Sequence, residues 1–302
     1  MKSAVLIAAV INFLVKTIIV RIHREKFQKI DIEMQEYIIN ANEDELTVLQ
    51  KYVNKCWIFQ GFMTCSYYLI SIGVITGPIF LPQKFPCDAV YPFPIDSIII
   101  STIVYLHQSI VGFQCSAGMA LDCQAAVFLW YISARLEILA KQMKNINNFK
   151  DLRSFIIIHQ NILRSADEVI YVIRFIFLTT IFMTKTGMIF GAIILLSNQP
   201  MVVKIQFTVL VISVSMSVFV CIWPAEKLIN VSGNHMARNI FHVSSTHPPA
   251  MRKLWLSVIR RTQTPITIKV VGFMDALSYE FFSSFLSTAF SYITALRVVV
   301  QT

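Results

Sequence analysis

The chain has 302 residues, of which 56% are hydrophobic and 14% are charged, and its mean hydropathy is +0.63. Soluble domains carry about 25% charged residues, so this composition excludes an ordinary soluble protein. The formal net charge of +9 would suit a nucleic-acid surface, but the basic residues alternate along the chain in a way that fits a membrane instead, and we expect no nucleic-acid partner.

The apolar residues form blocks, and a membrane-spanning helix needs about 20 mostly apolar residues. Runs such as 98–104 lack the alternation of a barrel strand, which leaves helices as the spanning structure. We therefore predict an all-α integral membrane protein with six spanning helices in a single domain, 1–302. The predicted spans are about 3–20, 57–82, 97–131, 169–197, 206–224 and 265–300.

The first block could be a signal peptide, because Lys2 precedes an apolar run. No small-residue cleavage site follows it, and Lys16, Arg21 and Arg24 lie at or just past its end. More positive charge follows the run than precedes it. We therefore expect a retained first helix whose N-terminus is outside the cell.

The connections between the blocks differ in charge. Lys and Arg number six in 21–55, six in 134–168 and seven in 225–272, but one each in 81–97 and 197–206. Cytoplasmic loops carry the excess of Lys and Arg. This pattern predicts a multi-pass protein with both termini extracellular.

The cytoplasmic connections are predicted to be helical extensions over about 21–55, 134–168 and 225–264. In 251–261, apolar and basic residues occupy opposite helix faces. Such a helix could lie on the lipid surface or pack within the bundle, and both alternatives stay open.

A few ionisable residues lie within or near the apolar blocks, where charge is costly. Lys16 and Arg174 are expected near the inner ends, where long side chains can reach water. Lys185 lies deeper, so a partner or a wet cavity is plausible there. Asp122 lies late in a block longer than one bilayer, so it could already be cytoplasmic.

No catalytic motif is recognisable, so we expect neither an enzyme nor a bound metal or cofactor. The six cysteines include no C-x-x-C pair, so we expect neither a cysteine metal site nor a disulfide framework. The single N-x-S/T match, Asn230-Val231-Ser232, falls in a cytoplasmic connection and is expected to be unglycosylated.

The C-terminal stretch 272–297 resembles the last helix of the insect odorant receptor family. It contains Leu277-Ser278 and then Ser291-Tyr292-Ile293-Thr294-Ala295-Leu296. Weaker similarities to that family follow in order along the chain: Tyr105, Gln108, Ala134-Arg135-Leu136, His159-Gln160-Asn161-Ile162-Leu163, Cys221-Ile222-Trp223, Glu226, Leu228-Ile229 and Thr262-Gln263-Thr264-Pro265.

The resemblance implies seven spanning helices and an intracellular N-terminus, whereas this chain shows six, the first starting outside. We therefore expect residue 1 to correspond to the second family helix. The related gustatory receptors are an alternative, but their ending fits less well. A G-protein-coupled receptor would have the opposite charge map, and a transporter would show internal repeats and broken helices.

By this resemblance, the chain is an odorant-binding subunit of a ligand-gated, non-selective cation channel in the plasma membrane. Its expected partners are an odorant co-receptor in a heterotetramer, a small volatile apolar ligand and membrane lipid. The candidate ligand-binding residues are aromatic or weakly polar and lie from mid-membrane outwards: Phe13, Tyr68, Ser71, Tyr105, Gln108, Phe207 and Leu210.

The last helix is expected to line the pore. Thr288, Tyr292, Ala295 and Val299 recur at spacings of three or four and therefore share one helix face. Four copies of this helix face around a central axis would form a narrow apolar ring, which can close a pore by dewetting. Arg297 is turned away from that face.

Overall fold

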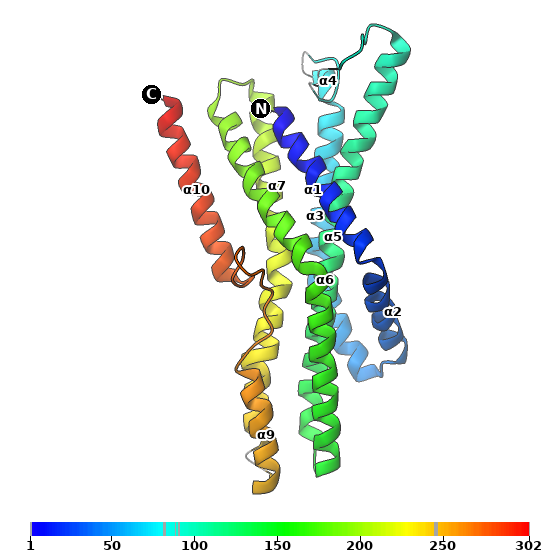
Figure 1. Cartoon of the computed structure of the whole chain (residues 1–302), viewed down its shortest axis with the longest axis vertical. Coiled ribbons are helices and arrows are strands. Elements are labelled where there is room, and N and C mark those ends of the chain that lie inside the picture. Colours follow the sequence, from blue (N-terminus) through cyan, green and yellow to red (C-terminus); the bar gives the residue numbers. More distant parts are fainter. Residues whose placement is uncertain (1, 81–82, 88, 90, 245–246, 302) are drawn as a thin grey trace.

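The computed structural model describes residues 2–80, 83–87, 89, 91–244 and 247–301, and within these it leaves undescribed the side chains of 2–5, 293 and 296–301. The described chain is an elongated bundle of helices, and its one β-type pairing is the isolated bridge Val270–Met274. The prediction of an all-helical membrane fold is confirmed. Figure 1 shows the helices running along the long axis, with both termini toward the same end.

The N-terminal part is a bent helix pair followed by a long helix. α1 (Lys2–Ile22) and α2 (Arg24–Asn40) meet at an angle of 75°. α3 (Glu43–Ile75) begins with a capping box, in which the Asn42 side chain accepts from the Glu45 N–H and the Glu45 carboxylate accepts from the Asn42 N–H. This reciprocal cap fixes where the helix starts.

The predicted second span is interrupted near its C-terminal end. α3 ends at Ile75, and the single turn α4 (Gly77–Phe80) follows it. The segment beyond α4 is irregular wherever it is described, as its prolines favour.

Two very long helices form the centre. α5 (Ile98–Gln142) is followed by the 3₁₀ turn η1 (Met143–Asn145), and α6 (Phe149–Leu196) returns along it. With 48 residues, α6 is about 72 Å long at 1.5 Å per residue, more than twice the roughly 30 Å of a hydrocarbon core. The bundle is therefore longer than one membrane thickness, and the position of its extensions relative to the membrane stays a prediction.

α7 (Met201–Asn230) continues through the π-helical turn η2 (Val231–His235) into α8 (Met236–Ser244), and α9 (Pro249–Thr262) follows. α3 packs along α5, and α6 packs along α7. The basic helix α9 packs through Trp255 into the main core, which supports the bundle alternative for 251–261.

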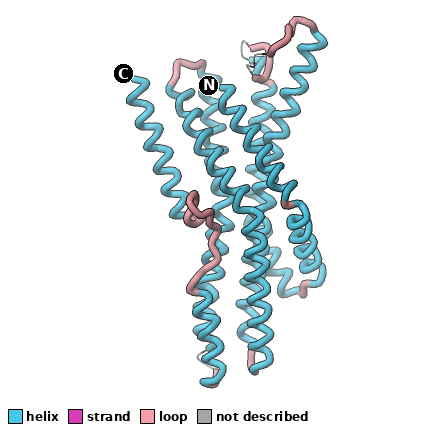
Figure 2. Tube along the Cα trace, in the orientation of Figure 1, coloured by secondary structure: helices cyan, strands magenta, loops and turns pink. Residues whose placement is uncertain are grey.

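The sixth predicted span, 265–300, is wrong in its first half. α10 (Tyr279–Gln301) begins fourteen residues later than predicted, after a loop, which Figure 2 shows between α9 and α10. Pro265 has no N–H for a helix, and Gly272 has a φ of 80°. The loop is anchored where Ile266 N donates to Ser232 Oγ at 3.0 Å.

Four helices of the described chain are long and apolar enough to cross a membrane: Glu43–Ile75, Ile98–Asn145, Phe149–Leu196 and Met201–Ser244. The bent pair α1–α2 could supply a fifth. The number of spans and the orientation in the membrane stay predictions.

Candidate functional site: a cavity between the helices

A cavity of about 610 Å³ lies between α1, α3, α5, α6 and α7. Its wall is mostly aliphatic, with contributions such as Ile7 and Ile11 from α1, Val74 from α3 and Val214 from α7. Part of the cavity volume exists because α5 has residues without large side chains there. A Cβ on Gly112 would meet Ile75 at 3.7 Å, and one on Gly118 would meet Phe13 at 3.6 Å.

Gln108 ties the segment before α5 to the cavity wall. Its Oε1 accepts from Cys87 N at 2.8 Å, and its Nε2 donates to the Tyr91 hydroxyl at 2.7 Å. Cys87, Tyr91 and Gln108 all line the cavity. The irregular segment therefore forms a wall that is held by a side chain of α5.

In the middle of the cavity, hydroxyl groups join α3 to α5. The Ser71 and Ser116 oxygens lie 2.6 Å apart, and each also reaches a backbone carbonyl at 2.8 Å, that of Gly112 for Ser71 and that of Tyr67 for Ser116. Because these groups satisfy one another, this part of the wall offers a ligand mainly packing contacts.

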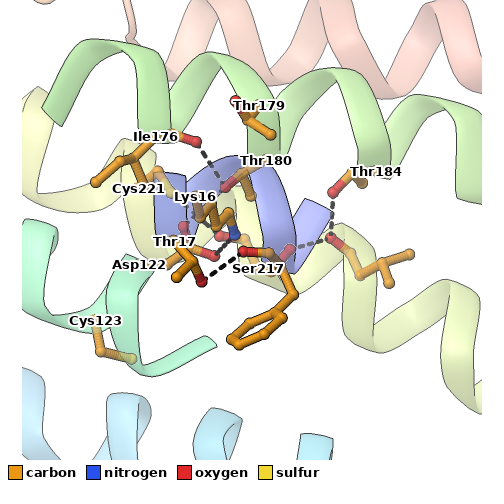
Figure 3. A network of polar contacts seen from close by, with 12 residues as sticks. Lys16, Thr17, Asp122, Cys123, Ile176, Thr179, Thr180, Thr184, Ser217 and Cys221 are labelled. Carbon is orange, nitrogen blue, oxygen red and sulfur yellow. Dashed lines mark hydrogen bonds and ion pairs between the residues drawn. The ribbon is translucent and has the colours of Figure 1, made fainter. Parts of the chain in front are cut away.

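A buried ion pair lies at the other end of the cavity. Lys16 Nζ donates to Asp122 Oδ2 at 2.6 Å, and the Thr180 hydroxyl donates to Asp122 Oδ1 at 2.8 Å. The Lys16 and Asp122 side chains are 1% and 2% exposed. Figure 3 shows Lys16, Asp122 and Thr180 converging from α1, α5 and α6.

The expectation that Lys16 reaches toward water is therefore wrong. Asp122 is buried within the bundle, and its depth in the membrane stays a prediction. A carboxylate on a neighbouring helix offers the ammonium a nearer partner than the membrane edge. Two opposite charges in separate apolar blocks were a signal for this pair, because intramembrane charges usually pair with one another.

Of the candidate ligand-binding residues, Ser71, Gln108 and Leu210 line the cavity together. The others do not belong to its wall. Phe13 packs beside Gly118, and Tyr68 lies against Phe113 with ring centroids 6.3 Å apart. The Tyr105 hydroxyl donates to the Ile75 carbonyl at 2.7 Å. Phe207 packs in a small cluster with Ile194 and Val203.

Sequence reasoning missed the contributions of Asn12, Lys16 and Asp122 to the wall. Asn12 and Lys16 lie one turn apart on α1, so they face the same side of that helix. This spacing was visible in the sequence, but which helix face points inward depends on packing.

A second, open groove follows one face of α10. It is lined by hydroxyl-rich residues at helical spacing: Glu280, Ser283, Ser284, Ser287, Thr288, Ser291, Tyr292 and Ala295. Three of the four candidate pore residues, Thr288, Tyr292 and Ala295, thus share a face. The side chain of Val299 lies outside the described residues.

No group of three or more His, Cys, Asp or Glu residues in the described chain is arranged to hold a metal ion. The geometry therefore offers a mostly apolar cavity with a few hydrogen-bonding groups between α1, α3, α5, α6 and α7, and a polar strip on α10.

A structure of the insect olfactory receptor OR5 from Machilis hrabei in complex with eugenol superposes with a TM-score of 0.84 and 14% sequence identity, over 99% of this chain and 81% of that chain. A second structure of that receptor gives a TM-score of 0.80 at 14% identity, over 97% and 79%. No curated protein sequence matches. A family model described as "7tm Odorant receptor" matches residues 1–290, which confirms the resemblance found in the sequence. The chain belongs to the odorant receptor family.

Proposed function

We propose that this chain is the odorant-binding subunit of a ligand-gated, non-selective cation channel that works with a co-receptor of its family. The observation that carries the proposal is the mostly apolar cavity of about 610 Å³ between the helices. Small-molecule sites are concave, mostly apolar and about 300–1,000 Å³ in volume, with few polar groups. The cavity meets each of these criteria, and the Machilis hrabei receptor structure contains a small odorant, eugenol.

α7 offers a mechanical link between the cavity and α10. Leu210, Val214 and Ser217 of α7 line the cavity. On the same helix, the Phe219 ring lies 5.6 Å from the Phe282 ring and 6.2 Å from the Tyr279 ring.

A hydrogen bond reinforces this link at the start of α10, where Tyr279 N donates to Glu226 Oε2 at 3.0 Å. A change in how α7 packs around a ligand would therefore shift the start of α10. An odorant opens the channel to the extent that it binds the open arrangement more tightly than the closed one.

The polar face of α10 supports a role in conduction. A strip of hydroxyl groups and one carboxylate is costly against lipid, so it needs water or protein beside it. Four copies of this face around an axis would enclose a hydrated path that narrows toward Ala295. Thr288, Tyr292, Ala295 and Val299 remain the proposed pore-lining residues, and Ser71, Gln108 and Leu210 remain proposed ligand contacts.

The proposal is tested by recording whole-cell current from cells that express this chain together with a co-receptor. We expect odorant-evoked cation current whose ligand ranking changes when Gln108 or Leu210 is replaced. Current with the same ranking from the co-receptor alone would contradict an odorant-binding role for this chain.

A further inference from the structure

The ion pair at the end of the cavity has no net charge, and this restricts the ligand. Lys16 and Asp122 neutralise one another across 2.6 Å, in side chains that are 1% and 2% exposed. An organic acid or amine would bring an uncompensated charge into this buried site, or would displace one partner and leave the other unpaired. Both events are costly away from water, so the site favours an uncharged ligand.

Lys16 retains hydrogen-bonding capacity. A lysine ammonium carries three N–H donors, and within the described chain the one acceptor bonded to Nζ is Asp122. Asp122 is better satisfied, because it accepts from both Lys16 and Thr180. The pair therefore offers a donor, rather than an acceptor, to a third group.

Asn12 supplies a hydrogen-bond acceptor near the donor on Lys16. Its Oδ1 atom is buried and has no hydrogen-bond partner among the described residues, although nearly all buried polar atoms in proteins have one. Asn12 also lines the cavity, one helical turn before Lys16. Side chains four apart on a helix have their Cβ atoms about 5–6 Å apart, so one small group can bridge them.

We propose that the cavity binds neutral hydroxyl-bearing molecules, alcohols or phenols, whose oxygen accepts a hydrogen bond from Lys16 Nζ and whose O–H donates to Asn12 Oδ1. The inference rests on the proposed odorant-binding function and names the ligand class for it. An ether or a ketone satisfies Lys16 but not Asn12, and a hydrocarbon satisfies neither. The apolar remainder of the wall accommodates the carbon chain.

The test measures binding of three ligands that are matched in size. Octanol, heptyl methyl ether and nonane have equal numbers of non-hydrogen atoms and differ in having a donor and acceptor, an acceptor alone, or neither. Binding to the purified full chain is measured as the ligand-induced rise in its thermal unfolding temperature, over a range of ligand concentrations. Because this readout does not require current, it is independent of channel function.

Three variants assign the contacts. Lys16→Met combined with Asp122→Leu removes both charges, which avoids a lone buried charge and is often tolerated. Asn12→Leu removes the unpartnered acceptor. Lys185→Met is the matched control, because Lys185 lies on α6 but does not line the cavity.

In the unmodified chain and in Lys185→Met, we expect the ether to bind about ten-fold more tightly than nonane, since a hydrogen bond to a charged group is worth about one decade or more. Octanol should bind a few-fold more tightly still, because it also donates to Asn12. Asn12→Leu should make octanol and ether equal, and the double variant should remove most of the preference for either over nonane.

Equal affinities for all three ligands in the unmodified chain would overturn the inference, and so would an alcohol preference that survives both the double variant and Asn12→Leu. The proposed function fails separately: if the alcohol preference follows the variants but no ligand evokes current with a co-receptor, the inference stands and the channel proposal does not.

Discussion

The two halves of α5 belong to one unbroken helix but have different surroundings. Over 98–115 its buried residues are Val104 and Gln108, and several large apolar side chains, such as Ile98 at 84% and Ile103 at 60%, are exposed. Over 125–140 nearly every residue is buried. We name 98–115 the outer half and 125–140 the inner half, after the predicted orientation. The outer half presents apolar surface away from the bundle and lines a cavity, whereas the inner half is surrounded by protein.

Polar contacts differ between the halves in the same way. In the inner half, Glu137 accepts from Lys51 at 2.7 Å and from the Tyr52 hydroxyl at 2.6 Å, and Lys227 lies 3.5 Å away. This carboxylate connects α3, α5 and α7. The outer half is joined by neutral hydroxyl and amide groups. A close-packed inner half thus supports an outer half that has room to adapt to a ligand.

The largest expected effect comes from removing a core side chain of the inner half. Phe128 is 0% exposed, and Phe128→Ala should lower the free energy of unfolding by about 3–5 kcal/mol, because it leaves a cavity in a close-packed core. Ile103→Ala is the matched control in the outer half and should change the free energy of unfolding by under about 1 kcal/mol. Thermal unfolding of the purified variants measures both, and equal losses would remove the distinction between the halves.

An effect of similar size is expected at the ion pair where the halves meet. Lys16→Met alone leaves Asp122 buried without its cation and should cost about 3–5 kcal/mol of folding stability. Adding Asp122→Leu should restore most of that loss, because an apolar pair needs no compensating charge. If the double variant is less stable than Lys16→Met, the pair contributes net stability and our description of this end of the cavity is incorrect.

A smaller difference is expected between two tyrosine hydroxyls. Tyr52 donates to the charged Glu137, so Tyr52→Phe should cost about 1.5–3 kcal/mol. Tyr105 donates to the neutral Ile75 carbonyl, so Tyr105→Phe should cost about 1 kcal/mol. Chemical or thermal unfolding of the two variants side by side gives the ranking, and the reverse order would show that the outer half is the more tightly held.

The smallest change tests the free space itself. Gly112→Ala places a methyl group at the cavity wall without a close clash, so the helix should gain up to about 1 kcal/mol while the affinity for long ligands falls a few-fold. Gly61→Ala is the control on α3, where no atom lies within 4 Å of the added Cβ. It should raise helix stability in the same way without lowering the affinity for ligands. A ligand titration of each variant separates the effects; unchanged affinity in Gly112→Ala would mean that ligands do not fill this region.

Much of this architecture could be predicted from residue patterns. The apolar blocks predicted the all-helical membrane fold, and the ordered motifs predicted the family. The start of α10 was missed because 265–278 is as apolar as a span, while Pro265, Gly272 and the tertiary bond from Ile266 to Ser232 prevent a helix there.

The cavity could be predicted only in part. Ser71, Gln108 and Leu210, which were predicted as ligand contacts, lie on its wall, and their binding of a ligand stays a prediction. Tyr68 and Tyr105 do not lie on it, because the direction of a side chain depends on which helices flank it. The pairing of Lys16 with Asp122 joins residues 106 positions apart, a contact that no local pattern determines.

Two native cysteines give the most direct test of ligand occupancy in this cavity. Cys115 lines it, whereas Cys65 is exposed on α3 and does not. The rate at which each reacts with N-ethylmaleimide is followed by mass spectrometry, with and without saturating octanol. Our account predicts that octanol slows the modification of Cys115 several-fold and leaves that of Cys65 unchanged. Saturable binding of octanol with no protection of Cys115, or with equal protection of both thiols, would contradict it.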